Sequence, residues 1–223
     1  MNTKPSSGLK AVVIGGTGAT GKALIQRLSE NQEYTEIVAL VRKKTAHLPS
    51  QVKQLVVNFD ELHQYASHIE GDVAFSCLGT TLKLAGSKDA QWKVDFDYQY
   101  DFARIASRNN IPVLVLLSAL NAKANSSIFY SRMKGTLENE IAELKFEKRI
   151  FVQPSLLIRP QTDRFAEKIS AWLMKPFIGL GLLESIRPLP VDTVALALMN
   201  SAKALAPGTN ILKVSDIVRH SKP

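Results

Sequence analysis

Three side chains in the middle of the sequence have the chemistry that hydride transfer to a carbonyl requires. Ser118 ends an apolar segment, and Tyr130 and Lys134 are four residues apart, so they share one face of a helix. The phenol would pass a proton to or from a substrate carbonyl, while the ammonium would lower the pKa of the phenol and hold ribose hydroxyls. The serine would orient the carbonyl. We predict these three as the catalytic residues.

The spacing of Tyr130 and Lys134 is also common on helix surfaces, where it has no functional meaning. Here, however, Tyr130 follows Ser118 by twelve residues, directly after the fifth apolar segment. Parallel sheets bind ligands at the carboxyl ends of their strands. This placement favours a catalytic or cofactor-binding role over a solvated surface.

A glycine-rich turn near the N-terminus predicts a dinucleotide site. Residues 15–21 read Gly-Gly-Thr-Gly-Ala-Thr-Gly, between a strand pattern and a helical pattern. In this fingerprint one glycine has a positive φ, one lets backbone approach a pyrophosphate and one lets helix pack on strand, while the helix N-terminus supplies N–H donors. A strand-to-helix turn without a ligand is the alternative. The predicted contacts are Gly15, Thr17, Gly18, Ala19, Thr20 and Gly21.

The end of the second strand pattern indicates which dinucleotide binds. Arg42 and Lys43 stand about where an NAD-specific site carries an Asp or Glu for the ribose 2′-hydroxyl. A guanidinium stacked on adenine and an ammonium paired with a 2′-phosphate favour NADP(H) over NAD(H). A solvated basic strand end is the alternative.

Two further turns carry predicted cofactor contacts. Asp60, just past the third strand pattern, could accept a hydrogen bond from the adenine amino group, cap the helix that follows, or do both. The fourth strand is followed by Cys77, Leu78, Gly79 and Thr80, in a turn whose glycine lets backbone pass close to the cofactor ribose. An unliganded β-turn explains these residues nearly as well.

Short apolar segments alternate with helical patterns along the chain, which is typical of βαβ units. The expected strands are residues 11–14, 37–41, 55–57, 72–77, 113–118 and 150–153, and the helices between them include one at 95–109. We predict an α/β fold, a doubly wound parallel sheet of the Rossmann type with five or six such units and helices on both faces.

The length of 223 residues suits a single α/β domain. We expect a dinucleotide-binding core at about residues 9–155 and a small C-terminal elaboration at about 156–215, whose cap elements would face a substrate. The elaboration would contain a helix at 164–174 and a helix at 193–203 that Asp192 caps.

Composition narrows the class of protein. The net charge of +8 comes from bases spread along the chain, so we expect phosphate-bearing small ligands and no nucleic acid. Cys77 is the only cysteine, and His63 and His68 are spaced unlike metal ligands, so we predict neither a disulfide nor a metal site. No membrane span and no signal peptide are predicted, and we expect a cytoplasmic monomer or homodimer.

These motifs resemble the short-chain dehydrogenase/reductase superfamily, and more closely its atypical Tat-interacting-protein-like oxidoreductases. The resemblance runs from about residue 10 to residue 200. It rests on residues 15–21, 77–81 and 94–98, on Ser118, and on Tyr130 with Lys134 and Gly135. It implies an NADPH-binding Rossmann domain with the Ser-Tyr-Lys catalytic set, in a group that also contains regulators.

One motif departs from the family's pattern. The Arg-Pro-Gly that the family carries after its sixth strand reads Gln153-Pro154-Ser155 here, so this chain lacks the arginine. Pro154 remains a predicted cofactor contact.

We therefore predict an NADP(H)-dependent oxidoreductase that moves a hydride between nicotinamide C4 and a small carbonyl or alcohol substrate. Two alternatives stay open. The first is a regulatory protein that senses NADPH and offers a partner surface at residues 172–183. The second is a nucleotide-sugar epimerase, for which the C-terminal portion is small. A sensor has no need of a Ser-Tyr-Lys set, which distinguishes it from an enzyme.

Overall fold

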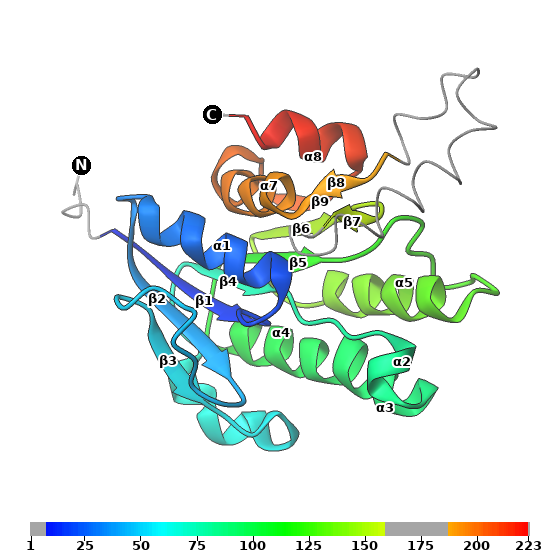
Figure 1. Ribbon diagram of the computed structural model, residues 1–223, viewed down its shortest axis with the longest axis horizontal. Helices are drawn as coiled ribbons and strands as arrows, with labels where there is room; N and C mark the ends of the chain where they lie inside the picture. The colour runs from blue at the N-terminus through cyan, green and yellow to red at the C-terminus, as the bar shows by residue number, and fades with distance from the viewer. Residues whose placement is uncertain (1–7, 159–186, 223) are drawn as a thin grey trace.

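A seven-stranded parallel sheet forms the centre of the computed structural model, which describes residues 8–158 and 187–222 (Figure 1). Its strands are β1 (Leu9–Ile14), β2 (Tyr34–Val41), β3 (Lys53–Val56), β4 (Val73–Ser76), β5 (Val113–Leu117), β6 (Lys148–Val152) and β9 (Gly208–Leu212). The spatial order is β3-β2-β1-β4-β5-β6-β9, with every neighbouring pair parallel. The first six strands have the Rossmann order, so the predicted fold class is confirmed.

Helices cover both faces of this sheet (Figure 1). One face packs against α1 (Ala19–Glu30), α7 (Val191–Ala204) and α8 (Val214–His220). The other face packs against the 3₁₀ helix η1 (Phe59–His68), α4 (Tyr98–Arg108) and α5 (Phe129–Ala142). Before α4 come α2 (Leu82–Ala85), α3 (Lys88–Trp92) and the π-helical turn η2 (Lys93–Asp97). A separate pair of short strands, β7 (Leu157–Ile158) and β8 (Leu189–Pro190), completes the described elements.

The strands read as continuous apolar segments because both of their faces are buried. In β1, Ala11 and Val13 join the core under α1 and α7, while Val12 and Ile14 join the core under α4 and α5. All four side chains are fully buried. The central strand is therefore held from both sides, which fixes where its carboxyl end lies.

The carboxyl ends of β1 and β4 mark the point where the strand order reverses. At this end Ile14 of β1 lies opposite Ser76 of β4 and Leu40 of β2. The chain leaves β1 through α1 on one face and leaves β4 toward α4 on the other face. Doubly wound sheets bind ligands in the crevice at this kind of switch point.

The C-terminal part of the chain differs from the expected cap. β9 pairs with β6 in the main sheet and α7 packs in the core beside α1, so both belong to the Rossmann layers. Asp192 does not cap α7, since Pro190 precedes that helix and the Asp192 carboxylate instead pairs with the Arg27 guanidinium of α1 at 2.6 Å. The helix expected at 164–174 and the partner surface expected at 172–183 lie outside the described residues.

The helix expected at 95–109 begins earlier in the structure. Helical backbone starts with α3 at Lys88 and passes through the π-helical turn η2 into α4. A π-helical turn inserts one extra residue into a helix and is frequent at functional sites. Here it carries Asp95, which the candidate site uses.

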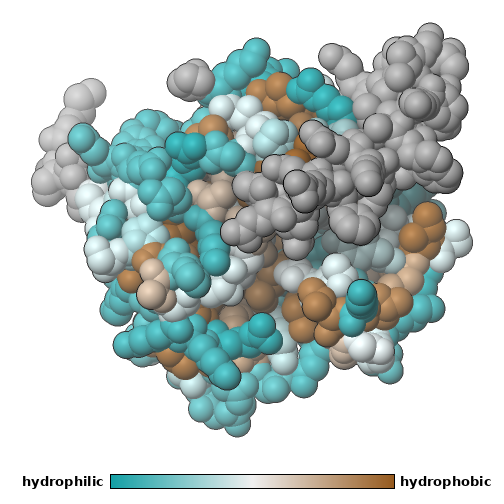
Figure 2. Space-filling view, in the orientation of Figure 1, coloured by the Kyte–Doolittle hydropathy of each residue, from teal (hydrophilic) through white to brown (hydrophobic). Residues whose placement is uncertain are grey.

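The surface carries some exposed apolar side chains. Figure 2 shows hydrophobic residues over α2 and α3, at the lower right, and Leu82 and Leu84 of α2 are 46% and 78% exposed. Among the described helices, none has both the length and the apolar character needed to span a membrane.

Candidate active site

The glycine turn between β1 and α1 packs against the end of β4. Gly15 has φ 77°, and a Cβ atom at this position would lie 2.3 Å from the Cys77 carbonyl carbon. A Cβ atom on Gly21 would lie 2.2 Å from the Gly15 carbonyl oxygen. Glycine at these two positions therefore lets α1 begin directly against the switch point.

The N-terminus of α1 is open to an anionic ligand. Gly18 is the residue before the helix, no side chain caps it, and the first turn contains no acidic residue. Thr17 and Gly18 are exposed. Uncapped N–H groups and the positive end of the helix dipole are suited to a phosphate.

Arg42 and Lys43 lie beside this turn. They directly follow β2, whose Leu40 is the register partner of Ile14 at the end of β1. Both side chains are exposed, and neither forms an ion pair with an acidic residue in the described ranges. Two cations are thus available at the strand end where the sequence predicts the 2′-phosphate.

Asp60 has a different local role from the predicted cap. The side chain of Asn58 accepts a hydrogen bond from the Asp60 backbone N–H at 3.1 Å, so Asn58 caps η1. The Asp60 carboxylate pairs with Lys93 Nζ at 2.6 Å and accepts from the Tyr98 hydroxyl at 2.8 Å. These two contacts, that of Lys93 first, lower the pKa of Asp60.

The turn after β4 connects the glycine turn to the interior. The Cys77 N–H donates to the Ile14 carbonyl at 3.0 Å, and the Thr80 N–H donates to Asp95 Oδ2 at 3.1 Å. Leu78 is half-buried and Gly79 is exposed. Burial raises the pKa of the Cys77 thiol to about 12, so this cysteine is a packing residue rather than a nucleophile.

Lys134 is buried beneath this edge of the sheet. Its side chain is 2% exposed, and Nζ lies 3.4 Å from Asp95 Oδ1, whose side chain is 0% exposed. Burial lowers the pKa of Lys134, and the neighbouring Asp95 carboxylate opposes that shift. Burial likewise raises the pKa of Asp95, opposed by Lys134. Each charge therefore depends on the other.

Asp95 is held at this position by a short chain of hydrogen bonds. The Ser76 hydroxyl of β4 donates to Gln99 Oε1 at 2.8 Å, and Gln99 Nε2 donates to the Asp95 carbonyl at 2.7 Å. All three residues are fully buried. The π-helical turn η2 is thereby fixed to the end of β4.

Tyr130 lies one turn before Lys134 on α5. Its side chain is 39% exposed, and its hydroxyl makes no hydrogen bond to any described residue. Partial burial and then the negative charge of Asp95 raise the pKa of Tyr130 to about 12. The expectation that Lys134 lowers this pKa is wrong, because burial of the phenol raises it and the Asp95 carboxylate beside Lys134 adds to the rise.

Ser118 directly follows β5 and is 5% exposed. Its hydroxyl donates to Glu138 Oε1, which lies one turn after Lys134 on α5. Gln153 Nε2, at the end of β6, donates to both oxygens of the same carboxyl group at 3.0 Å. Burial raises the pKa of Glu138, and these hydrogen bonds oppose the shift.

The structure thus brings Lys134 and the Ser118 hydroxyl to the same side of α5 but engages each with a carboxyl group. Asp95 and Glu138 were not predicted as site residues. The spacing of Tyr130, Lys134 and Glu138 at i, i+4 and i+8 was the available signal for Glu138. Pro154 is buried, and its carbonyl accepts from the Leu120 N–H at 2.9 Å.

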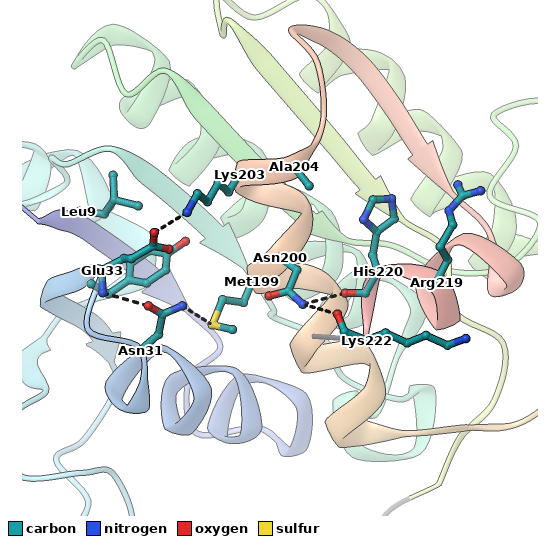
Figure 3. Close-up of a pocket in the computed structure, with 11 residues that line it drawn as sticks. Leu9, Asn31, Glu33, Met199, Asn200, Lys203, Ala204, Arg219, His220 and Lys222 are labelled. Atoms are coloured by element: carbon teal, nitrogen blue, oxygen red, sulfur yellow. Dashed lines mark hydrogen bonds and ion pairs between the residues drawn. The ribbon is translucent and has the colours of Figure 1, made fainter.

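A cavity of about 440 Å³ opens at the opposite, amino edge of the sheet (Figure 3). Its polar groups bond to one another: Lys203 Nζ pairs with Glu33, and Asn200 Nδ2 donates to the His220 carbonyl at 2.9 Å. This edge is opposite the glycine turn. The cavity is therefore separate from the candidate active site.

The sheet order and the glycine turn define a protein of the Rossmann fold. Residues 10–92 match the family model "Semialdehyde dehydrogenase, NAD binding domain". Among solved structures, a UDP-glucose 4-epimerase from Thermotoga maritima with UDP-glucose has a TM-score of 0.68 at 12% identity, covering 94% of this chain and 80% of that one. A short-chain dehydrogenase/reductase superfamily protein from Agrobacterium tumefaciens with bound NAD has a TM-score of 0.66 at 12% identity, covering 94% and 81%.

Curated relatives identify the family. Protein HTATIP2 of Rattus norvegicus is 32% identical over 209 residues, 91% of this chain and 84% of the relative. Protein FMP52, mitochondrial, of Eremothecium gossypii is 31% identical over 186 residues, 82% of this chain and 83% of the relative. The chain belongs to the family of HTATIP2 and FMP52 proteins.

One sequence-based expectation is contradicted by these relatives. The expected cytoplasmic location conflicts with the names of the FMP52 proteins of Eremothecium gossypii, Kluyveromyces lactis and Candida albicans, all of which are designated mitochondrial.

Proposed function

We propose that the protein is an NADP(H)-dependent oxidoreductase that reduces a small carbonyl substrate with Ser118, Tyr130 and Lys134. The observation that carries this proposal is the buried pair of Lys134 and Asp95 at the carboxyl edge of the sheet. A buried ion pair adds little to stability compared with apolar packing. Strongly perturbed charges in the binding crevice of a doubly wound sheet are instead typical of an active site.

The glycine turn would hold the dinucleotide. Its uncapped helix N-terminus faces the crevice, and the family model that matches residues 10–92 is named for NAD binding. Lys134 would hold the ribose hydroxyls, and Tyr130, one helical turn away, would lie at the reacting carbonyl. The dinucleotide would supply the hydride.

The raised pKa of Tyr130 keeps its phenol in the protonated form that carbonyl reduction requires. A phenol with a pKa of about 12 keeps its proton at neutral pH, so it can donate to a carbonyl oxygen but is a poor base toward an alcohol. Tyr130 is also the exposed member of the set, which lets a substrate reach it. We therefore propose that it acts as the general acid.

The preference for NADP(H) would come from Arg42 and Lys43. Their side chains are exposed and free of described acidic partners at the end of β2. Titration with NADPH and NADH, followed by nicotinamide fluorescence, tests this role. Arg42→Ala should weaken NADPH binding about ten-fold or more, as expected for a charge-assisted contact, and leave NADH binding unchanged.

Arg108 at the end of α4 is the matched control for this titration, because it is an exposed arginine at the amino edge of the sheet. Arg108→Ala should bind both dinucleotides like the wild type. Equal affinity of the wild-type protein for NADPH and NADH would contradict the assignment of the 2′-phosphate to Arg42 and Lys43.

A dinucleotide sensor without turnover is the second candidate. It is favoured by the Ser118 hydroxyl, which is committed to Glu138, and by a Tyr130 hydroxyl that bonds to no described residue. NADPH oxidation with a panel of aldehydes and ketones, run with the wild type and Tyr130→Phe, separates the two. Turnover that requires the phenol supports the enzyme, whereas NADPH binding without turnover on any substrate supports the sensor.

A further inference from the structure

The carboxyl group of Glu138 controls which hydrogen-bonding role Ser118 can take. A hydroxyl has one donor and two acceptor sites. Because Ser118 gives its proton to Glu138 Oε1, only its lone pairs remain for a substrate. A substrate carbonyl is itself an acceptor, so Ser118 cannot bond to it in this state. The serine can orient a carbonyl only when Glu138 carries a proton and donates to Ser118 instead.

The partner of Glu138 allows this exchange. Gln153 Nε2 lies 3.0 Å from both Glu138 oxygens, and its neutral amide can bond to either the ionised or the protonated carboxyl group. An arginine at position 153 would bind the carboxylate with a fixed positive charge and hold it ionised. The glutamine in this chain leaves the proton exchangeable.

Burial and positive charge have opposite effects on the ionisation of the Glu138 carboxyl group. Glu138 is 6% exposed. On the same helix it faces Lys134, whose charge favours ionisation. A cavity of about 800 Å³ borders Glu138 and Gln153 and is also lined by Lys123 of the loop after β5 and Lys213 before α8. Burial disfavours the ionised carboxyl group, the hydrogen bonds from Ser118 and Gln153 and the charge of Lys134 favour it, and the cavity gives water access to the proton.

We propose that Glu138 and Gln153 are positioning residues that switch Ser118 between hydrogen-bond acceptor and donor, so that carbonyl binding uses the protonated form of Glu138. This inference rests on the proposed oxidoreductase function, in which Ser118 orients the substrate.

The test measures the titration of Glu138 directly, with no need of a substrate. The ¹³C carboxyl resonances of glutamate-labelled protein are followed against pH, and the Glu138 signal is assigned with Glu138→Gln. In the wild type Glu138 should titrate above the ordinary value of about 4.3. In Gln153→Arg its pKa should fall by at least about one unit, as beside any new cation. Glu140, exposed on the same helix, is the internal reference and should not move.

Carbonyl reduction by the same proteins gives the second readout. If the panel of carbonyl substrates yields turnover, kcat/KM should fall as pH rises through the Glu138 pKa in the wild type. In Gln153→Arg the fall in kcat/KM should move to lower pH together with the titration of the Glu138 carboxyl group.

The outcomes separate the two proposals. A Glu138 pKa at the ordinary value, or one that is unchanged in Gln153→Arg, overturns the switch even if the protein is an active reductase. A second outcome is a Glu138 pKa that is raised in the wild type and falls in Gln153→Arg, in a protein that turns over no substrate. This result would contradict both the proposed reductase activity and the role of Glu138 in it. Turnover whose pH dependence ignores the Glu138 pKa overturns the switch alone.

Discussion

Replacing Lys134 with methionine tests whether the buried pair with Asp95 is charged. Lys134 and Asp95 are 2% and 0% exposed, and Nζ lies 3.4 Å from Oδ1. Removing one partner of a buried ion pair leaves an uncompensated charge, at a cost of about 3–5 kcal/mol. Lys134→Met should therefore lower the free energy of unfolding by about this amount at neutral pH.

The loss should depend on pH, because Asp95 can take up a proton when its partner is gone. Burial raises the pKa of Asp95, and Lys134 opposes that shift. Without Lys134 the folded-state pKa rises further above the unfolded value of about 3.9. Between these two values the folded state binds more protons than the unfolded state, so the free energy of unfolding falls by up to about 1.4 kcal/mol per pH unit as pH rises.

Urea unfolding followed by circular dichroism at about pH 5 and at neutral pH measures this effect. Lys134→Met should be closer to the wild type at the lower pH, and the double variant with Asp95→Asn should regain stability and lose the pH dependence. The exposed pair of Lys203 and Glu33 is the control, since Lys203→Met should cost at most about 1 kcal/mol. A loss in Lys134→Met as small as in the control, or equal at both pH values, would refute the reasoning.

Two further predictions follow from the turn at the switch point. Gly21→Ala places a methyl group 2.2 Å from the Gly15 carbonyl oxygen, so it should lower the free energy of unfolding by about 1–3 kcal/mol and weaken NADPH binding. An unchanged melting temperature would contradict this packing. Cys77 should resist alkylation by iodoacetamide at neutral pH until the protein unfolds, because its thiol is buried and has a pKa of about 12. Rapid modification of the folded protein would contradict this burial.

The Rossmann core could be predicted because the sequence patterns that indicate it lie within short, consecutive segments of the chain. The first strand, the glycine turn and the first helix are consecutive in the chain, and the strands are buried on both faces, which gives continuous apolar segments. β9 was missed for the opposite reason. At the edge of the sheet its residues 208–211 alternate between half-buried and exposed and only Leu212 is buried, so no continuous apolar segment marks the strand.

The site was predicted less completely, because burial of charged side chains depends on tertiary packing. Acidic residues such as Asp95 and Glu138 usually lie on the exposed face of a helix. Here both are buried, next to the predicted site residues Lys134 and Ser118. The π-helical turn that aims Asp95 inward has no pattern in a single sequence. The predicted lowering of the Tyr130 pKa by Lys134 failed because the sequence reveals neither the burial of the phenol nor the Asp95 carboxylate that lies beside Lys134.

The expected cytoplasmic location was wrong for a related reason. It was inferred from a single cysteine and the absence of a signal-peptide pattern, and neither observation identifies a compartment. The mitochondrial names of the FMP52 relatives correct it.

The turnover of Tyr130→Phe tests the proposed carbonyl reduction most directly. On a carbonyl substrate that the wild type reduces with NADPH, loss of the hydroxyl should lower kcat by roughly two to four powers of ten while NADPH affinity changes little. Tyr65→Phe, which removes a phenol hydroxyl from η1, should leave both values unchanged. Unchanged turnover in Tyr130→Phe would contradict general acid catalysis by this residue.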